Sequence, residues 1–307
     1  MSKLRFTFDD AEVMEFLAGQ ESQFLESPTY FRDRVRDRLL LGVENFGDCL
    51  PWRKTMKLFR ARPGEVTIWS GINGHGKSMV LGMASLWFLE VTKVCIASLE
   101  MTPESTIQRM LKQAAGTDSP SIEFLDRWLE SVEGSLWVYD QLDSLPSDRV
   151  LAMCHYAINK LECKHIVIDS LMKCGIGEED YQAQGDFVDK LCWIAKKYSV
   201  HIHLVHHMRK GRSEDDMPDK FDVKGASRIT DMVDNLIIVH RNKSKERRLS
   251  QGKAVEELEP DTRLRIAKHR HGEWEGDIAL YFDVPSQQYR SAPDSRQMIF
   301  NLERAAS

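Results

Sequence analysis

A glycine-rich segment at residues 71–78, GINGHGKS, follows directly after the β-branched and aromatic run EVTIWS. Gly71, Gly76, Lys77 and Ser78 have the spacing of a phosphate-binding loop, G-x-x-x-x-G-K-[ST]. The glycines let the backbone curl so that its N–H groups face a phosphate, and a helix starting at Lys77 adds a positive dipole end. Lys77 would reach the β- and γ-phosphates of a nucleotide, while Ser78 would offer its hydroxyl to Mg²⁺. A strand, such a loop and a helix in this order are typical of an α/β nucleotide-binding fold.

Beyond about residue 64 the chain alternates between apolar runs and helical patterns. Strand character occurs at VTIWS, KVCIAS, LWVYD, HIVIDS, HIHLV and NLIIVH. The helical patterns that separate the first five runs cover residues 78–90, 103–115, 147–161 and 187–198. This series predicts a mostly parallel, twisted sheet with helices on both faces, followed by C-terminal antiparallel strands at TRLRIAKHR, DIALYFDV and QQYRS. Two long polar loops, at residues 208–222 and 242–261, are expected to be functional or mobile.

Composition excludes several classes of protein. The chain has 307 residues, of which 42% are hydrophobic and 29% charged, as in ordinary globular proteins. A net charge of −5 means that a nucleic-acid site would need a local concentration of Lys and Arg. The six cysteines form no C-x-x-C pair, which favours free thiols in a reducing compartment. Without an apolar signal region or a run approaching the ~18 residues of a membrane span, we expect a cytoplasmic protein with no membrane partner.

Two carboxylates follow predicted strands at the sheet edge that carries the glycine-rich loop. Asp169 closes HIVIDS, and we assign it to Mg²⁺ through a bound water; helix capping is the alternative. Glu100 follows KVCIAS and could polarise a water that attacks a phosphate, or it could be an ordinary solvent-facing glutamate.

The run HIHLVHH contains four histidines within residues 201–207. A zinc site would need carboxylate or cysteine partners that this segment lacks. We therefore favour one functional histidine at the end of the strand, His206 or His207, which would hydrogen-bond the γ-phosphate and respond to its loss.

Six motifs together resemble the RecA-like P-loop ATPase domain of hexameric replicative helicases, the family of DnaB, the phage primase–helicases and the mitochondrial Twinkle helicase. They are GINGHGKS, SLEMTPES, HIVIDS, HLVHHMRKG, DVKGASRITDMVDNLIIVHRN and RIAKHRHG, and the resemblance covers roughly residues 50–290. It implies ATP, or another NTP or dNTP, with Mg²⁺ at the interfaces of a homo-hexameric ring. The ring would translocate 5′→3′ on single-stranded DNA during replication.

The resemblance also implies catalytic roles. Glu100 matches the catalytic glutamate, and His207 matches a polar sensor that is His in the phage enzymes and Gln in the bacterial ones. Lys268 and Arg270 match the basic pair that reaches the nucleotide of the adjacent subunit, with Arg270 as the arginine finger. Asp169 and Ser78 match the metal-binding pair.

For the nucleotide, Arg241 matches, more loosely, an arginine near the base, whereas His75 is an unusual residue within such a loop. The implied nucleotide-binding residues are Gly71, Asn73, Gly74, His75, Gly76, Lys77, Ser78, Met79 and Arg241.

Residues 222–227 match the loop that holds DNA in the central channel of the ring. The expected DNA contacts are Arg209, Lys210, Arg212, Lys220, Lys224, Gly225 and Ala226. For the individual charges other than Lys224, a solvated loop is the alternative. Lys224 stands where the bacterial family has Arg, and Arg228 where a small residue is usual, so the details of DNA contact differ from the family pattern.

Because a primase module and a full N-terminal helical collar are missing from the sequence, it resembles a stand-alone helicase domain. A phage that encodes its primase and polymerase separately would use such a protein in the cytoplasm of its bacterial host. We expect a tail and linker helix at residues 1–50, the ATPase domain at 51–295 and a C-terminal tail at 296–307. Residues 27–42, SPTYFRDRVRDRLLLG, would form the linker helix, packed either on its own domain or on a neighbouring subunit.

Two other functions remain open. One is a RecA/RadA-like recombination ATPase that forms filaments. The other is a helicase loader or DNA-binding protein that uses nucleotide as a switch. The assembled shape (closed ring, filament or monomer) would distinguish these from the helicase.

Overall fold

The computed structural model describes residues 25–42, 46–142, 144–208, 215–223 and 226–300, and it divides into two compact units, Met1–Phe46 and Gly47–Ser307. In the first unit, a 3₁₀ turn, η2 (Pro28–Phe31), leads into helix α2 (Arg32–Leu41), which confirms the helix predicted there. Its apolar side chains are exposed, among them Tyr30, Val35 and Leu39. The guanidinium of Arg34 lies over the rings of Tyr30 and Phe31.

The second unit is built on a sheet whose described strands have the order β11-β10-β9-β8-β3-β7-β6-β4-β5. The central six strands are parallel, and three antiparallel strands follow at one side, as predicted. The parallel strands are β3 (Val66–Gly71), β4 (Val94–Ser98), β5 (Leu136–Val138), β6 (His165–Asp169), β7 (His201–His207) and β8 (Asn235–Arg241). The antiparallel strands are β9 (Thr262–His269), β10 (Gly276–Asp283) and β11 (Gln288–Arg290), and a separate pair joins β1 (Asp48–Cys49) to β2 (Arg60–Ala61).

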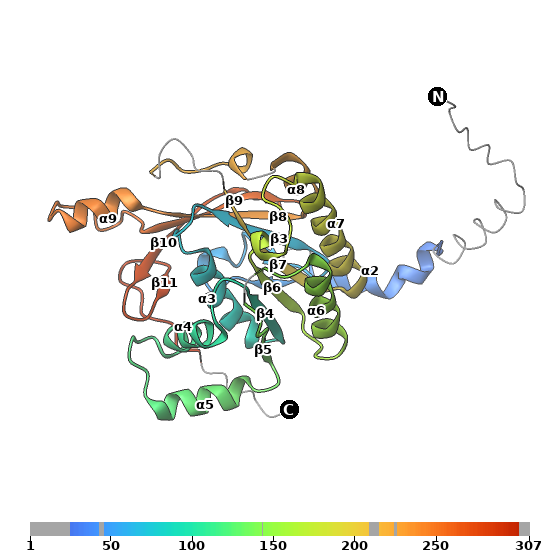
Figure 1. Ribbon diagram of the computed structural model, residues 1–307, viewed down its shortest axis with the longest axis horizontal. Coiled ribbons are helices and arrows are strands. Elements are labelled where there is room, and N and C mark those ends of the chain that lie inside the picture. Colours follow the sequence, from blue (N-terminus) through green and yellow to red (C-terminus); the bar gives the residue numbers. More distant parts are fainter. Residues whose placement is uncertain (1–24, 43–45, 143, 209–214, 224–225, 301–307) are drawn as a thin grey trace, which may run out of the picture. The chain divides into compact units, whose positions relative to one another are not determined.

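Helices cover both faces of this sheet (Figure 1). The helices are α3 (Lys77–Leu89), α4 (Pro103–Ala115), α5 (Ile122–Val132), α6 (Ser147–Asn159), α7 (Tyr181–Tyr198), α8 (Ala226–Met232) and α9 (Lys243–Ser250), with short 3₁₀ turns η4 (Arg53–Thr55), η5 (Leu171–Lys173) and η6 (Lys220–Asp222). Alternation along β3 places Ile68 in a core cluster with residues of α6 and α7, and Trp69 in a second cluster with residues of α3 and α4. None of the described helices is long and apolar enough to cross a membrane.

The helical predictions were wrong in three places. Helix α5 was missed, although Ser121 caps it by accepting a hydrogen bond from the Phe124 N–H group. Helix α7 begins at Tyr181, six residues before the predicted start. The expected loop at residues 242–261 contains α9, whose sequence KSKERRLS has no apolar face to reveal it. At the C-terminal side, packing continues to the buried Phe300, beyond the boundary expected at residue 295.

Candidate functional site: the nucleotide cavity

The glycine-rich loop joins the end of β3 to the start of α3, as predicted. The ammonium of Lys77 donates hydrogen bonds to the carbonyl oxygens of Gly71 (2.9 Å) and Ile72 (3.2 Å). Burial lowers the pKa of Lys77, and the nearby carboxylates of Asp169 and Glu100 oppose this effect.

Two glycines of the loop are required by close approach. A Cβ atom on Gly71 would lie 2.4 Å from the Val239 carbonyl oxygen of β8. Gly76 has φ +88°, and a Cβ atom there would lie 2.2 Å from the hydroxyl of Tyr289. Side chains at these positions would displace the loop from the sheet, so both glycines serve its shape.

A cavity of about 840 Å³ opens beside this loop. Ten of the residues predicted for the site line it together: Asn73, Gly74, Gly76, Lys77, Ser78, Met79, Glu100, Asp169, His207 and Arg241. They come from the carboxyl ends of β4, β6, β7 and β8 and from the loop after β3, the edge at which ligands bind in open α/β sheets.

Glu100 is held by two side chains from neighbouring strands. The Ser170 hydroxyl donates a 2.6 Å hydrogen bond to its Oε1 atom, and His207 Nε2 lies 3.3 Å from the same atom. The bond with His207 is the main reason that the pKa of Glu100 is lowered to about 2. Glu100 is therefore an ionised, oriented carboxylate at neutral pH.

Asp169 has the opposite electrostatic balance. Burial raises its pKa, while a hydrogen bond with Ser78 and the charge of Lys77 lower it. The carboxylate and the hydroxyl are hard oxygen ligands, and their adjacency beside the phosphate-binding loop fits the preference of Mg²⁺.

His75 lies within the loop but does not line the cavity. Its side chain is buried, its Nδ1 atom accepts a 3.1 Å hydrogen bond from the Arg241 N–H group, and its ring is 5.3 Å from that of His240. Burial is the main cause that lowers its pKa to about 4. The imidazole therefore ties the loop to β8, and any nucleotide contact of His75 would come from its backbone.

Lys268 and Arg270 lie at the other edge of the sheet. Because β9 is antiparallel to β8, His269 pairs with Asn235 at the start of β8, whereas the cavity is at the carboxyl ends of the parallel strands. The six residues of β3 separate these edges by about 20 Å. The basic pair is thus not brought to the cavity of its own chain.

Most of the residues predicted to bind DNA lie outside the described part of the chain: Arg209, Lys210, Arg212, Lys224 and Gly225. Ala226 is the first residue of α8. Lys220 lies in η6 with its side chain exposed and its ammonium 5.5 Å from the centre of the Phe221 ring.

Three residues of the site were missed by the sequence predictions. Arg109 of α4 and Tyr289 of β11 line the cavity, and no motif marks either position. Ser170 directly follows the strand-end Asp169, and this adjacency was a signal that could have identified it. Among the described residues, no group of three or more His, Cys, Asp and Glu side chains is arranged to hold a metal ion.

Comparisons with known proteins agree with this geometry. The Twinkle homolog protein, chloroplastic/mitochondrial, of Arabidopsis thaliana is 25% identical over 224 residues, which are 64% of this chain and 31% of that protein. The chain thus spans about a third of the length of this curated relative. The solved structure of a DnaB-like replicative helicase, described with its interactions with primase, matches 87% of this chain and 67% of its own with a TM-score of 0.66 and 14% identity. A second solved structure, that of an isolated ATPase domain, matches 74% of this chain and 84% of its own with a TM-score of 0.60 and 15% identity.

These structural likenesses show a shared fold, the RecA-like fold expected from the motifs. The family model described as an AAA domain matches residues 51–213, a segment that runs from before the glycine-rich loop to beyond the strand that carries His207. Since that segment is more than half of the 307 residues, the chain belongs to the AAA domain family.

Proposed function

We propose that this protein is the ATPase of a replicative DNA helicase. Six copies would form a ring that translocates 5′→3′ on single-stranded DNA, powered by hydrolysis of ATP, or another NTP or dNTP, at the subunit interfaces. The AAA domain, the likeness to a Twinkle homolog and the fold shared with a DnaB-like helicase support this proposal.

The observation that carries the proposal is the separation of two halves of a hydrolytic site. Glu100 and Lys77 line the cavity, whereas Arg270 and Lys268 lie at the opposite edge of the same sheet. If two copies pack edge to edge, the basic pair of one reaches the cavity of the next. An arginine supplied in this way is worth about 10³–10⁵ in rate, so a single copy would hydrolyse slowly.

Within the cavity each residue has a physical role. Lys77 and the backbone N–H groups of the loop would bind the β- and γ-phosphates, and Glu100 would accept a proton from the attacking water. Ser78 and Asp169 would hold Mg²⁺, which supplies positive charge to the phosphates when bound. His207, fixed against Glu100, precedes the segment 208–222 in the chain, so its response to the γ-phosphate could move that segment.

DNA would be held by the local basic charges of residues 209–227, which act despite the acidic total. We assign the motor to residues 51–295, the linker helix and tail to residues 1–50, and a short tail to residues 296–307. A separate primase and a replicative polymerase are the partners that we propose, acting with the protein in the cytoplasm.

Mixing two inactive variants tests the shared site. Arg270→Ala should bind nucleotide but not hydrolyse it, and Glu100→Ala should also be inactive. A mixture of the two should recover partial activity, because some interfaces then pair an intact Glu100 with an intact Arg270. The control mixes Arg270→Ala with the Arg270→Ala/Glu100→Ala double variant, in which no interface is intact.

The assembly is tested by measuring the ATPase rate against protein concentration, with and without single-stranded DNA, while the particle mass is followed. A hexamer-sized particle and a steep, DNA-stimulated rise would support the ring. A flat rate from a monomer, or full turnover by Arg270→Ala, would overturn it.

A further inference from the structure

The nucleotide cavity has two chemically different ends. Glu100, Asp169 and His207 come from β4, β6 and β7, which lie on one side of β3 in the sheet. Arg241 of β8 and Tyr289 of β11 line the cavity on the other side of β3. If the reactive γ-phosphate faces Glu100 and Lys77 binds the phosphates in the middle, then the nucleoside extends toward Arg241. This step rests on the function proposed above.

The guanidinium of Arg241 is held in place by a carboxylate from another element. Its Nε atom donates to Oε1 of Glu246 on α9, and Oε2 of Glu246 accepts a 3.2 Å hydrogen bond from Lys243. The Arg241 guanidinium lies over the Phe282 ring, 5.9 Å from its centre. One guanidinium edge is therefore occupied by a carboxylate, and the planar group is oriented rather than free to follow the nearest anion.

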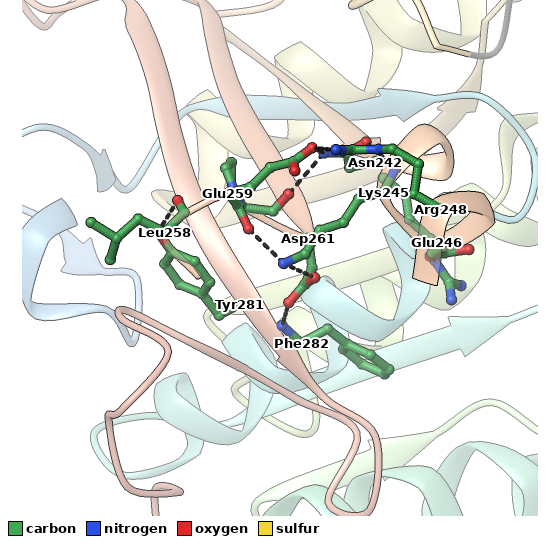
Figure 2. Close-up of polar contacts among 11 residues, drawn as sticks. Asn242, Lys245, Glu246, Arg248, Leu258, Glu259, Asp261, Tyr281 and Phe282 are labelled. Carbon is green, nitrogen blue, oxygen red and sulfur yellow. Dashed lines mark hydrogen bonds and ion pairs between the residues drawn. The ribbon is translucent and has the colours of Figure 1, made fainter. Parts of the chain in front are cut away.

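Helix α9 is itself anchored, so Glu246 has a fixed position. Asn242 caps the helix by accepting from the Lys245 N–H group (2.9 Å), and it donates from Nδ2 to Glu259 (2.9 Å). The ammonium of Lys245, only 9% exposed, pairs with Asp261 at 2.7 Å. Figure 2 shows these contacts converging at the base of the insertion, where Asp261 also accepts from the N–H group of Phe282. The residue under the Arg241 guanidinium and the helix that holds it are thus tied together.

We infer that Glu246 is a positioning residue that orients Arg241 for contact with the nucleobase, so that the insertion between β8 and β9 governs recognition of the nucleoside part of the nucleotide. Glu246 neutralises Arg241, which makes the guanidinium a flat surface for the base rather than a further phosphate ligand. Without the carboxylate, the same cation would be released toward the triphosphate.

Equilibrium binding of two probes to the full-length protein tests this role: ATP and inorganic triphosphate, both with Mg²⁺. Glu246→Gln keeps the size of the side chain and removes its charge. We expect it to weaken ATP binding by about three- to tenfold, the range of a lost cation–π contact, and to leave triphosphate binding unchanged or stronger. Equal weakening of both probes, or no change for ATP, would overturn the inference.

A double variant separates positioning from a general structural effect. Arg241→Ala should weaken ATP binding, and Glu246→Gln added to it should cause no further loss, because Glu246 acts only through Arg241. A further loss in the double variant would contradict the inference. Glu257→Gln, an exposed glutamate of the same insertion, removes the same charge and should leave both affinities as in the wild type. A wild-type protein that binds neither probe would instead refute the proposed function itself.

Discussion

The carboxylate of Asp234 pairs with the guanidinium of Arg270, with Oδ1 and Nη1 separated by 3.3 Å. Asp234 is buried, and its Oδ2 atom accepts a hydrogen bond from the N–H group of Val66 at the start of β3. Arg270 Nη2 also donates to the carbonyl oxygens of Asp231 and Met232 at the end of α8. The proposed arginine finger therefore starts from a fixed position, attached both to the sheet and to the helix that follows the DNA-binding segment.

Asp234→Asn should lower the hydrolysis rate without weakening nucleotide binding. It leaves an acceptor for Val66 but removes the charge that holds Arg270, a charge-assisted contact worth ~1.5–3 kcal/mol. We expect kcat to fall about tenfold or more while KM stays near the wild-type value, because the cavity lies at the other edge of the sheet. Asp231→Asn is the matched control, since Asp231 contacts Arg270 only through its backbone carbonyl, and it should retain kcat. Equal rates for the two variants would count against Asp234.

His207→Ala should reduce kcat about 100-fold at saturating nucleotide, because Glu100 loses a hydrogen bond that orients it. His207→Gln retains a donor and should lose less. The pKa of Glu100 is about 2, so even a rise to its ordinary value leaves it ionised at pH 7. The loss should therefore be constant between pH 6 and 8, and steady-state rates across that range would test it. Ser170→Ala, which removes the other donor to Glu100, should act in the same direction; a loss that disappears at high pH would contradict the orienting role.

Much of the fold was predictable because its signals are local. The six parallel strands are short, apolar and bounded by turn residues, and the helices α3, α4 and α6 repeat apolar residues at helical spacing. Helix α9 gives no such signal, since its order comes from Asn242, Lys245 and Asp261, which are brought together only by the folded chain. Tertiary contacts here override the sequence pattern.

For the site, the motif residues were predictable and their supporting contacts were not. Glu100, Asp169 and Lys77 follow from strand ends and loop spacing. By contrast, the inward turn of His75 toward Arg241 depends on packing between β3 and β8, two strands far apart in the sequence. Tyr289 reaches the loop from β11, and only the order of strands in the sheet places it there.

Three of the histidines form a buried network rather than a ligand set. The Trp69 indole donates to His203 Nδ1 (3.1 Å), His203 Nε2 lies 2.9 Å from His165 Nδ1, and His165 Nε2 lies 2.9 Å from the Asp48 carboxylate. An indole can only donate and a carboxylate can only accept, so each neutral imidazole has a single allowed tautomer. The network ties β1, β3, β6 and β7 together at the edge away from the cavity.

Buried neutral histidines should make the fold sensitive to acid. Burial lowers the pKa of His201 to about 3 and those of His75 and His269 to about 4, and it holds the pKa of His203 well below its usual range. Unfolded histidines bind protons below a pH of about 6.5, so the free energy of unfolding should fall as the pH drops from about 6.5 toward 4.

Glu65 opposes this effect. Burial raises its pKa to about 7, so its folded form holds a proton that the unfolded chain releases above a pH of about 4.5. The net slope near pH 5.5 should be about 4 kcal/mol per pH unit, from roughly three protons at ~1.4 kcal/mol each. Urea midpoints at pH 7.5, 6.5 and 5.5 measure it, and Glu65→Gln should make the slope steeper. A midpoint that does not change with pH would refute the neutral histidines.

Gly185 of α7 makes room for Arg228, the residue that departs from the family pattern on α8. A Cβ atom on Gly185 would lie 2.6 Å from Arg228 Nε, and Arg228 pairs with Asp186 at 2.5 Å between Nη2 and Oδ1. Gly185→Ala gains up to about 1 kcal/mol of helix propensity and loses a surface ion pair worth at most about 1 kcal/mol. Because the exposed Arg228 side chain can move away, we expect thermal stability to stay equal or rise slightly. Affinity for single-stranded DNA, measured by fluorescence anisotropy, should fall by up to about fivefold, since α8 loses its tie to α7. Asp186→Asn breaks the same pair without adding a methyl group and should weaken DNA binding alike, whereas unchanged affinity in both variants would show that the pair does not position α8.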